Sequence, residues 1–442
     1  MGPTVDPVQS DEKLPARADV VVVGGGIIGS ATALELAERG VAVALCEKGG
    51  IAAEQSSRNW GWVRKMGRDP RELPLIIESL RLWEGLAPRI GADVGFRQSG
   101  ILYACDSDAD LARREAWLEH ARPYRLDTRM LSAEETRALL PGANRRFKGA
   151  LYTASDGRAE PQKAAPAIAR AARRRGAAIL LHCAVRGVEQ AGGRISGVVT
   201  ERGRIACSSV VLAGGAWSSL FCASLGLRLP QLKVLGSVLR TEPIEGPPTT
   251  AVWADGYAFR KRLDGGYTVA NGHGSVADIV PDSFRYFADF LPALGMEWRS
   301  LSFRIGRRFV EEWRTPRRWS LDETSPFERV RILDPVPRAG QTVAALARLA
   351  RAIPAFASAR VAQHWAGLID VTPDAVPVIS AVDALLGFFV ATGFSGHGFG
   401  IGPAAGRLMA DLVTGAKPIV DPTPFRFTRF TDGSKPRPIA GL

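Results

Sequence analysis

The chain has 442 residues, of which 46% are hydrophobic and 23% are charged, and its formal net charge is +12. This length and composition predict two or three globular folding units and exclude a disordered or fibrous chain. The basic balance comes without a recognisable nucleic-acid-binding module, so no nucleic-acid partner is expected.

The sequence also lacks targeting signals and metal motifs. No apolar stretch is long enough to cross a bilayer, and residues 1–19 do not have the cationic start and apolar core of a secretory signal. We therefore expect a cytoplasmic protein with no transmembrane segment. The five cysteines and five histidines show no ligand spacing, which predicts reduced thiols and no metal site.

The first structural signal in chain order is a β-α-β unit. Residues 1–17 carry little apolar material and are expected to form a flexible arm. The run Val20–Val23 is typical of a strand buried on both faces, and the next apolar run, Val41–Cys46, is predicted as its neighbour. A helix is expected between them, and the whole unit has the usual size of about 30 residues.

A glycine-rich turn joins the first strand to this helix. Gly24-Gly25-Gly26-Ile27-Ile28-Gly29 fits the pattern G-x-G-x-x-G, in which Gly24 permits the turn, Gly26 admits a pyrophosphate and Gly29 lets the helix pack closely. The helix N-terminus supplies N–H donors to phosphates, and Glu47 closes the second strand, where a carboxylate accepts hydrogen bonds from ribose hydroxyls. We therefore predict a dinucleotide site; the alternative is a purely structural glycine turn.

Two further loops carry polar and glycine residues suited to a flavin. The first, Gln55–Arg64, offers hydroxyl, amide and guanidinium groups for a pyrophosphate and ribityl chain, and its tryptophans could flank a planar ring. The second, Val390–Gly400, opens a helix whose N-terminus can place positive potential beside the N1/C2 carbonyl edge of a flavin. The alternatives are a polar loop with two core tryptophans and a glycine-rich turn between strand and helix. Together the two loops favour FAD over a nicotinamide.

Helices and strands alternate through the middle of the chain. Helices are expected near residues 75–86, 108–122, 132–140 and 162–175, with Ser132 and Glu135 capping the third. Strands are expected near 95–103, 178–190, 193–200 and 205–213, and strand pairs over 231–271 with a hairpin turn at 264–266. Further strands are predicted over 361–392, a helix over 403–414, and a surface tail after residue 416.

With these motifs, the chain resembles the FAD-dependent amino acid and amine oxidoreductases of the D-amino acid oxidase, glycine oxidase and sarcosine oxidase type. The resemblance covers residues 19–100, 149–217 and 365–415, roughly half of the chain. It is carried by the glycine-rich β-α-β unit with Glu47, by Val211-Leu212-Ala213-Gly214-Gly215-Ala216-Trp217, by Trp365-Ala366-Gly367-Leu368 with Thr372-Pro373-Asp374, and by the turn at 391–400.

This resemblance implies an α/β fold with a Rossmann-like FAD-binding domain built from discontinuous segments, plus an α+β substrate domain with an antiparallel sheet. Residues 18–88, 149–225 and 360–416 would form the FAD-binding domain, residues 89–148 and 226–359 the substrate domain, and residues 417–442 a C-terminal tail. The residues implied to hold FAD are Gly24, Gly26, Ile27, Ile28, Gly29, Glu47, Lys48, Ser56, Ser57, Asn59, Trp60, Gly61, Val185, Gly214, Gly215, Trp217, Gly393, Gly396, His397 and Gly398.

One position departs from the family pattern. Relatives that act on small amino acids often have an arginine directly after Trp-Ala-Gly-Leu, where it holds the substrate carboxylate, whereas this chain has Ile369 followed by Asp370. Either another cation binds the carboxylate, or the substrate carries none at that place. Asp370 is expected to hydrogen-bond the backbone rather than face the substrate. The candidate substrate contacts are Arg64, Arg260, Arg304, Ile369, Asp370 and His397; for the arginines the alternative is a plain surface position.

The function implied by the resemblance is oxidation of a C–N bond in an amine or amino acid to an imine, with hydride transfer to flavin N5, followed by hydrolysis. O2 or another acceptor would take the electrons onward. No dedicated base is expected, because orientation and a neutral amine carry most of this chemistry. One alternative is an NADPH-fed flavin monooxygenase, although a second nucleotide motif is missing; the other is a non-catalytic assembly or partner-binding protein that FAD stabilises.

Overall fold

The predicted β-α-β unit stands at the centre of a sheet in the computed structural model, which describes residues 1–272, 275–297 and 301–439. Strand β1 (Val20–Val23) leads through helix α1 (Ile27–Glu38) into β2 (Val43–Cys46). β1 pairs in parallel with β2 and with β13 (Ser209–Leu212). The strand order is β21-β22-β13-β1-β2-β9, completed by β9 (Ala178–Leu180), β21 (Val378–Ala381) and β22 (Phe388–Thr392).

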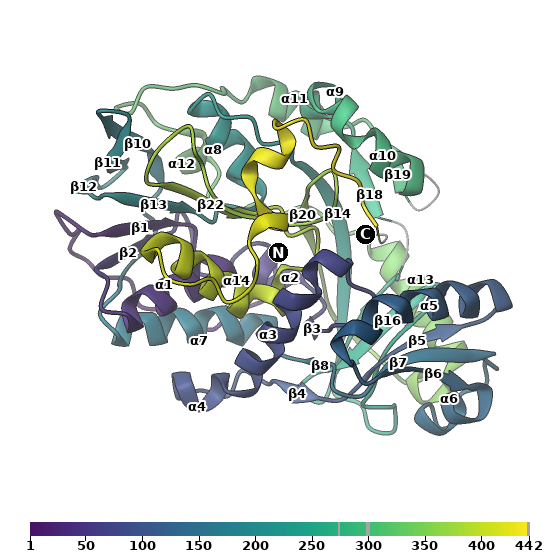
Figure 1. Ribbon diagram of the computed structural model, residues 1–442. Helices are drawn as coiled ribbons and strands as arrows, with labels where there is room; N and C mark the ends of the chain where they lie inside the picture. The colour runs from purple at the N-terminus through teal and green to yellow at the C-terminus, as the bar shows by residue number, and fades with distance from the viewer. Residues whose placement is uncertain (273–274, 298–300, 440–442) are drawn as a thin grey trace.

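Helices cover one face of this first sheet, and a small sheet covers the other. α1, α7 (Pro161–Arg174) and α14 (Gly398–Thr414) pack together below the sheet in Figure 1, with α3 (Leu73–Glu84) against α14. At Gly406 a Cβ would lie 2.5 Å from the Ala31 Cβ, so α14 approaches α1 this closely only with glycine there. The opposite face carries the antiparallel strands β10 (Val185–Ala191), β11 (Arg194–Thr200) and β12 (Gly203–Ala206), together with α8 (Ser218–Ser224).

A second, mostly antiparallel sheet extends in Figure 1 from the upper right, where β18 and β19 lie, through the centre to the lower right, where β5, β6 and β7 lie. Its order is β19-β18-β14-β17-β16-β15-β5-β7-β6, with β20 also paired to β14. The strands are β5 (Ile101–Cys105), β6 (Thr128–Ser132), β7 (Gly149–Thr153), β14 (Leu232–Thr241), β15 (Ala251–Ala254), β16 (Tyr257–Lys261), β17 (Tyr267–Ala270), β18 (Ser275–Asp278), β19 (Leu301–Arg304) and β20 (Val361–Val371). β7 and β20 fall within ranges assigned from sequence to the FAD-binding domain, so the pairing differs from that division at these two strands.

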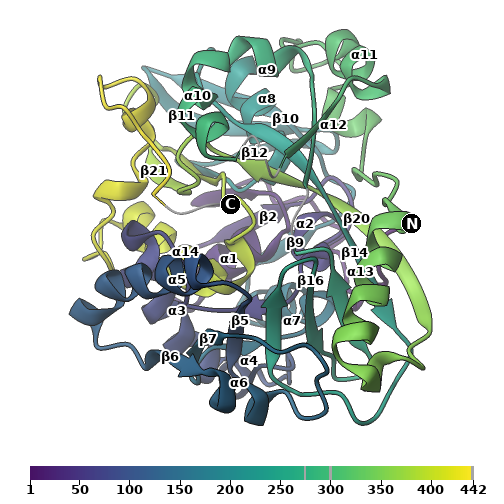
Figure 2. The ribbon, with the colours of Figure 1, turned by 90° about the vertical axis from the view of Figure 1, so that its right-hand side faces the viewer.

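Local sequence signals match the elements around this second sheet. The turn predicted at residues 264–266 joins β16 to β17. At α6 (Ala133–Leu139) the predicted capping box is present: the Glu135 N–H donates to Ser132 Oγ at 3.1 Å, and the Ser132 N–H donates to Glu135 Oε2 at 2.8 Å. Helix α13 (Ala339–Ala352) lies beside β14 and β16, as Figure 2 shows, and buries Leu346 and Leu349 against Phe259.

Shorter elements complete the described chain. The helices are α2 (Gln55–Arg58), α4 (Leu86–Ile90), α5 (Asp108–Ala121), α9 (Pro281–Arg285), α10 (Phe287–Glu297), α11 (Arg307–Arg314) and α12 (Pro326–Arg329), and the strands β3 (Trp62–Val63), β4 (Arg97–Gln98) and β8 (Gly157–Arg158) form a small sheet. No helix within the described ranges combines the length and the apolar sequence that crossing a bilayer requires.

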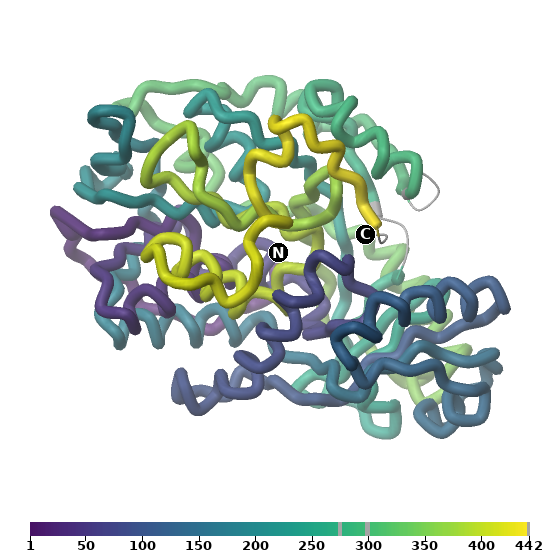
Figure 3. The backbone as a smooth tube through the Cα atoms, viewed as in Figure 1, coloured from purple at the N-terminus to yellow at the C-terminus, as the bar shows by residue number. Residues whose placement is uncertain are grey.

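Both terminal segments lie against the body of the protein, and Figure 3 traces them. The N-terminal segment has no helix or strand of its own, yet Asp11 accepts hydrogen bonds from Arg173 of α7 and from the Ile179 N–H of β9. The C-terminal segment forms two short 3-10 helices, η5 (Thr423–Phe425) and η6 (Phe427–Phe430), and buries Phe425 almost completely. Residues 440–442 of the predicted tail lie outside the described residues.

Candidate functional site

A cavity of about 940 Å³ runs between the two sheets. Its walls come from the glycine turn after β1, the segment 46–59 after β2, the turn after β13, strands β14 and β20, and the N-terminus of α14. At the other end it reaches Trp60, Trp62, Tyr103 and Trp253. One space therefore joins the predicted nucleotide site to side chains of the second sheet.

The three glycines of the turn have different neighbours. Gly24 has a φ of +111°, and a Cβ there would lie 2.4 Å from the Ala213 carbonyl oxygen. A Cβ on Gly29 would lie 2.0 Å from the Gly24 carbonyl oxygen, so this glycine lets α1 pack on the strand. A Cβ on Gly26 would meet only Ser56 Oγ, at 3.1 Å. Gly26 is thus the position where the backbone is open to a ligand, as the motif predicts.

Glu47 is held at the edge of the same opening. Its Oε2 accepts a hydrogen bond from the Gly25 N–H, and its Oε1 accepts one from the Gly49 N–H, both at 2.7 Å. Burial raises the pKa of this carboxyl, while Lys48 and the two backbone donors act in the opposite direction. Each carboxylate oxygen has a further lone pair, so Glu47 can still accept hydrogen bonds from ribose hydroxyls.

Most of the predicted cofactor residues line the cavity. They are Gly24, Gly26, Ile27, Ile28, Glu47, Lys48, Ser56, Asn59, Trp60, Val185, Gly214, Gly215, Trp217, Gly396, His397 and Gly398. Gly29, Ser57, Gly61 and Gly393 are not among the lining residues of the described chain. Gly61 and Gly393 adopt φ values of +79° and +72°, and Ser57 Oγ donates to the Glu54 carbonyl, so these residues shape the backbone behind the wall.

His397 caps α14 at the cavity wall. Its Nδ1 lies 3.0 Å from Glu72 Oε2, and because a carboxylate oxygen accepts, Nδ1 carries the proton and Nε2 is left as an acceptor. Burial, reinforced by the Arg68 charge, lowers the pKa of His397 to about 4, so the ring is neutral at physiological pH. Glu72 was not predicted, because no local pattern links it to a histidine 325 residues away.

The two residues at the departure from the family pattern, Ile369 and Asp370, both line the cavity. Asp370 is buried, and its Oδ2 accepts hydrogen bonds from the Gly393 N–H at 2.8 Å, from Gln231 Nε2 at 3.0 Å and from Thr392 Oγ1 at 3.1 Å. These hydrogen bonds, one from the backbone and two from side chains, tie β20 to the turn before α14.

Only one of the three candidate arginines lies at the cavity, among the residues that the structure describes. Arg64 is part of the wall. Arg260 is buried behind it, where its guanidinium donates to both carboxylate oxygens of Glu160 at 2.7 and 3.1 Å. Arg304 is half exposed on β19 and pairs with Asp278 at 2.6 Å. Arg260 and Arg304 thus each pair with a carboxylate of the protein, Glu160 and Asp278.

Aromatic rings form the far wall. The centroid of Trp60 lies 5.3 Å from that of Trp62 and 5.7 Å from that of Trp253, and Tyr103 lies 5.1 Å from Trp253. The two tryptophans of the Gln55–Arg64 loop thus contact each other and the second sheet. Tyr103 and Trp253 were not predicted, since they belong to β5 and β15 and reach the site only through the pairing of those strands.

The sequence and the fold were compared with those of known proteins. The family model described as FAD dependent oxidoreductase (DAO) matches residues 19–412. The chain belongs to this family. An L-amino acid deaminase from Proteus myxofaciens, solved in complex with anthranilate, is 38% identical with a TM-score of 0.93, covering 98% of this chain and 97% of that one. Glycine oxidase of Pseudomonas aeruginosa and sarcosine oxidase subunit beta of Rhizobium meliloti are each 29% identical, over 92% and 94% of this chain and 97% and 89% of their own.

The protein is therefore an FAD-dependent oxidoreductase, and its relatives support activity of the amino acid or amine oxidase and deaminase kind. The residues present fit the cofactor of the DAO family. Gly26 leaves the backbone open beside the N-terminus of α1, and Glu47 stands at the end of β2 with acceptor capacity to spare. No group of three or more His, Cys, Asp or Glu side chains in the described ranges is placed to hold a metal ion.

Proposed function

We propose that this protein oxidises the C–N bond of an amino acid to an imine, which water then hydrolyses to a 2-oxo acid and ammonia or an amine. The observation that carries the proposal is the continuous cavity, which joins the glycine turn and Glu47 at one end to the aromatic wall at the other. A reactant that enters from the second sheet is thereby led toward the FAD cradle. When bound, FAD accepts the two electrons that leave the substrate.

The side chains of the wall favour the reactive form of an amine. Trp60, Trp62 and Trp253 replace water around a bound substrate, and removal from water favours a neutral amine over an ammonium ion. The neutral amine has a free lone pair, which supports loss of hydride from the neighbouring carbon. His397 lies in the same wall as a neutral ring, so it adds no positive charge that would repel the developing iminium.

The relatives favour an amino acid over a simple amine as the donor. One similar structure is an L-amino acid deaminase and a similar sequence is a glycine oxidase, and both names specify an amino acid. We extend this substrate class to the present chain.

The test is anaerobic mixing of the purified FAD-loaded protein with a panel of L- and D-amino acids, sarcosine, amines and NADPH. We expect amino acids to bleach the visible flavin absorbance and to yield the corresponding 2-oxo acid, one per two electrons. Bleaching by NADPH alone would instead support a monooxygenase. No bleaching by any compound, with FAD bound, would support a non-catalytic protein.

A further inference from the structure

Two arginine side chains lie over the ring of Tyr103 at the aromatic end of the cavity, and a third, Arg68, interacts electrostatically with Tyr103 and Arg64. The Arg114 guanidinium carbon, from α5, lies 4.7 Å from the ring centroid, and that of Arg64 lies 5.7 Å from it. Arg68 is almost fully buried beside them. All four residues line the cavity, and they come from three parts of the chain: residues 64–68, β5 and α5.

Several hydrogen-bond donors in this cluster have no acceptor among the described residues. They are Arg68 Nη1, Arg114 Nε, Trp62 Nε1 and Tyr103 Oη, each buried. Arginine and tryptophan nitrogens can only donate, and a tyrosine hydroxyl can donate as well. Buried polar groups are normally hydrogen-bonded, so four unpaired donors at one place need a partner that supplies lone pairs.

The carboxylates nearby already bind other groups, although Glu72 Oε1 has no hydrogen-bond partner among the described residues. Glu72 Oε2 lies 4.0 Å from Arg68 Nη1 but only 3.0 Å from His397 Nδ1. Asp156 accepts hydrogen bonds from the Lys65 and Met66 N–H groups, at 2.8 and 3.1 Å. Burial lowers the pKa of Arg68 to about 10, which still leaves it charged at neutral pH. Among the described residues, the cluster therefore has positive charge and four unpaired donors, against a single unpaired acceptor, Glu72 Oε1.

We propose that Arg64, Arg68, Arg114, Trp62 and Tyr103, here named the Tyr103 subsite, bind the carboxylate of the amino acid substrate. This inference rests on the proposed function, and it moves the carboxylate away from position 369, where the chain has an isoleucine in place of the arginine of small-substrate relatives. Several donors of the Tyr103 subsite thus take the place of the single arginine that small-substrate relatives have at position 369. A substrate without a carboxylate leaves the same donors unpaired and binds less well.

The experiment measures binding rather than turnover, in the FAD-loaded protein. Anthranilate, the ligand seen with the Proteus myxofaciens relative, serves as the anionic probe and 2-aminobenzamide as its neutral counterpart, each titrated by the change in flavin absorbance. The test variants are Arg114→Gln and Tyr103→Phe. The control is Arg122→Gln, which removes one charge from an exposed arginine at the end of the same helix.

We expect Arg114→Gln to raise the Kd of anthranilate about tenfold, because one charge-assisted hydrogen bond is lost, and Tyr103→Phe to raise it about threefold. The control variant and the Kd of 2-aminobenzamide should change by less than about twofold, as expected for exposed charges and neutral ligands. If Arg114→Gln loses FAD, Tyr103→Phe, which keeps the ring, gives the decisive value.

Two results would overturn the inference: no anthranilate binding to the wild type, or an unchanged Kd in FAD-loaded Tyr103→Phe and Arg114→Gln. Failure of the proposed function looks different. In that case anthranilate binds with the expected dependence on Arg114, while no amino acid bleaches the flavin.

Discussion

Gly26 and Gly29 belong to the same motif, yet the structure gives them separate roles. A side chain at Gly26 would enter the open space in front of the α1 N-terminus, whereas a side chain at Gly29 would collide with the Gly24 carbonyl. We expect Gly26→Val to abolish FAD retention while the apoprotein still folds, because the valine fills the volume that a pyrophosphate needs. Bound FAD per protein, from the absorbance ratio after gel filtration, measures this.

Gly29→Ala is the matched contrast for that experiment. It should lower the free energy of unfolding of the apoprotein by about 1–3 kcal/mol, the usual range for overpacking, since the backbone of β1 and α1 must move apart. Wild-type FAD content in Gly26→Val would show that the turn does not face the cofactor. Equal apoprotein stability in Gly29→Ala and wild type would contradict the packing role.

The residues that sequence predicts well are those whose function depends on neighbours in the chain. The glycine turn and Glu47 belong to one short unit, so their spacing already places them together. The Tyr103 subsite is different, because Trp62, Tyr103 and Arg114 come from β3, β5 and α5 and meet only through tertiary packing. The same limit applies to Arg260 and Arg304, whose carboxylate partners lie 100 and 26 residues away.

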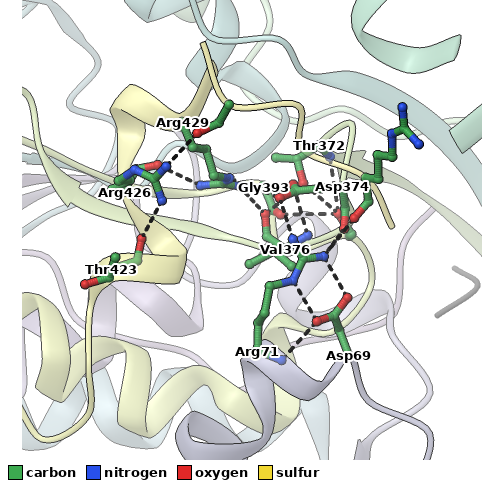
Figure 4. Close-up of polar contacts among 12 residues, drawn as sticks. Asp69, Arg71, Thr372, Asp374, Val376, Gly393, Thr423, Arg426 and Arg429 are labelled. Atoms are coloured by element: carbon green, nitrogen blue, oxygen red, sulfur yellow. Dashed lines mark hydrogen bonds and ion pairs between the residues drawn. The ribbon is translucent and has the colours of Figure 1, made fainter. Parts of the chain in front are cut away.

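Among the elements, the C-terminal segment is fixed by a buried ion pair. Figure 4 shows Arg429 of η6 beside Asp374, which follows β20. Arg429 Nε and Nη2 lie 3.1 and 3.2 Å from the two Asp374 carboxylate oxygens, and Nη2 also donates to the Val376 carbonyl at 2.6 Å. Arg71 reaches the same carboxylate at 3.4 Å and pairs with Asp69. The C-terminal segment therefore packs behind the turn that leads into α14.

Arg429→Met should lower the free energy of unfolding by about 3 kcal/mol, because it leaves Asp374 buried with only the longer contact to Arg71. Urea unfolding of the FAD-loaded protein measures the change. Arg426→Met is the control: its partner Asp432 is partly exposed, and surface pairs contribute about 0–1 kcal/mol. Similar losses in the two variants would mean that the tail is held by its apolar residues alone.

Elements with strong local signals were predictable, and those that depend on distant strands were not. The capping box of α6 and the hairpin turn between β16 and β17 are encoded within a few residues. β7 and β20 have no such signal for their partners; β20 pairs with β14, more than 100 residues earlier in the chain. A domain division drawn along the sequence therefore does not follow the pairing of these two strands.

At the scale of the whole molecule, the cavity exists only because the two sheets face each other. β14 and β20 belong to the second sheet, yet Val234 and Ile369 on them line the same space as Gly24 and Glu47 of the first. The Asp370 carboxylate, held by Gly393, connects β20 to the turn that begins α14. His397 in the wall of this space and Asp156 elsewhere are both buried in the folded protein, so their titration couples folding to pH.

His397 and Asp156 affect stability with opposite sign. The pKa of His397 falls to about 4 in the folded protein, mainly through burial, against about 6.5 when unfolded. Between these values the unfolded chain binds the extra proton, so stability decreases as pH falls from 6.5 to 4. Burial raises the pKa of Asp156 to about 6, so between pH 3.8 and 6 the folded state binds the extra proton and stability increases as pH falls.

We therefore expect a variant that removes one of these two groups to show the pH dependence of stability that the other group causes. The wild type should show a shallow change in the free energy of unfolding between pH 6.5 and 4, because the two contributions partly cancel. Asp156→Asn should make the loss of stability on acidification steeper, approaching the full His397 contribution of about 3 kcal/mol. In His397→Gln the free energy of unfolding should rise as pH falls from 6.5 to 4, whereas in the wild type it changes little. The glutamine can still donate a hydrogen bond to Glu72. Urea unfolding at a series of pH values with saturating FAD measures all three slopes, and parallel curves would show that neither group is buried as described.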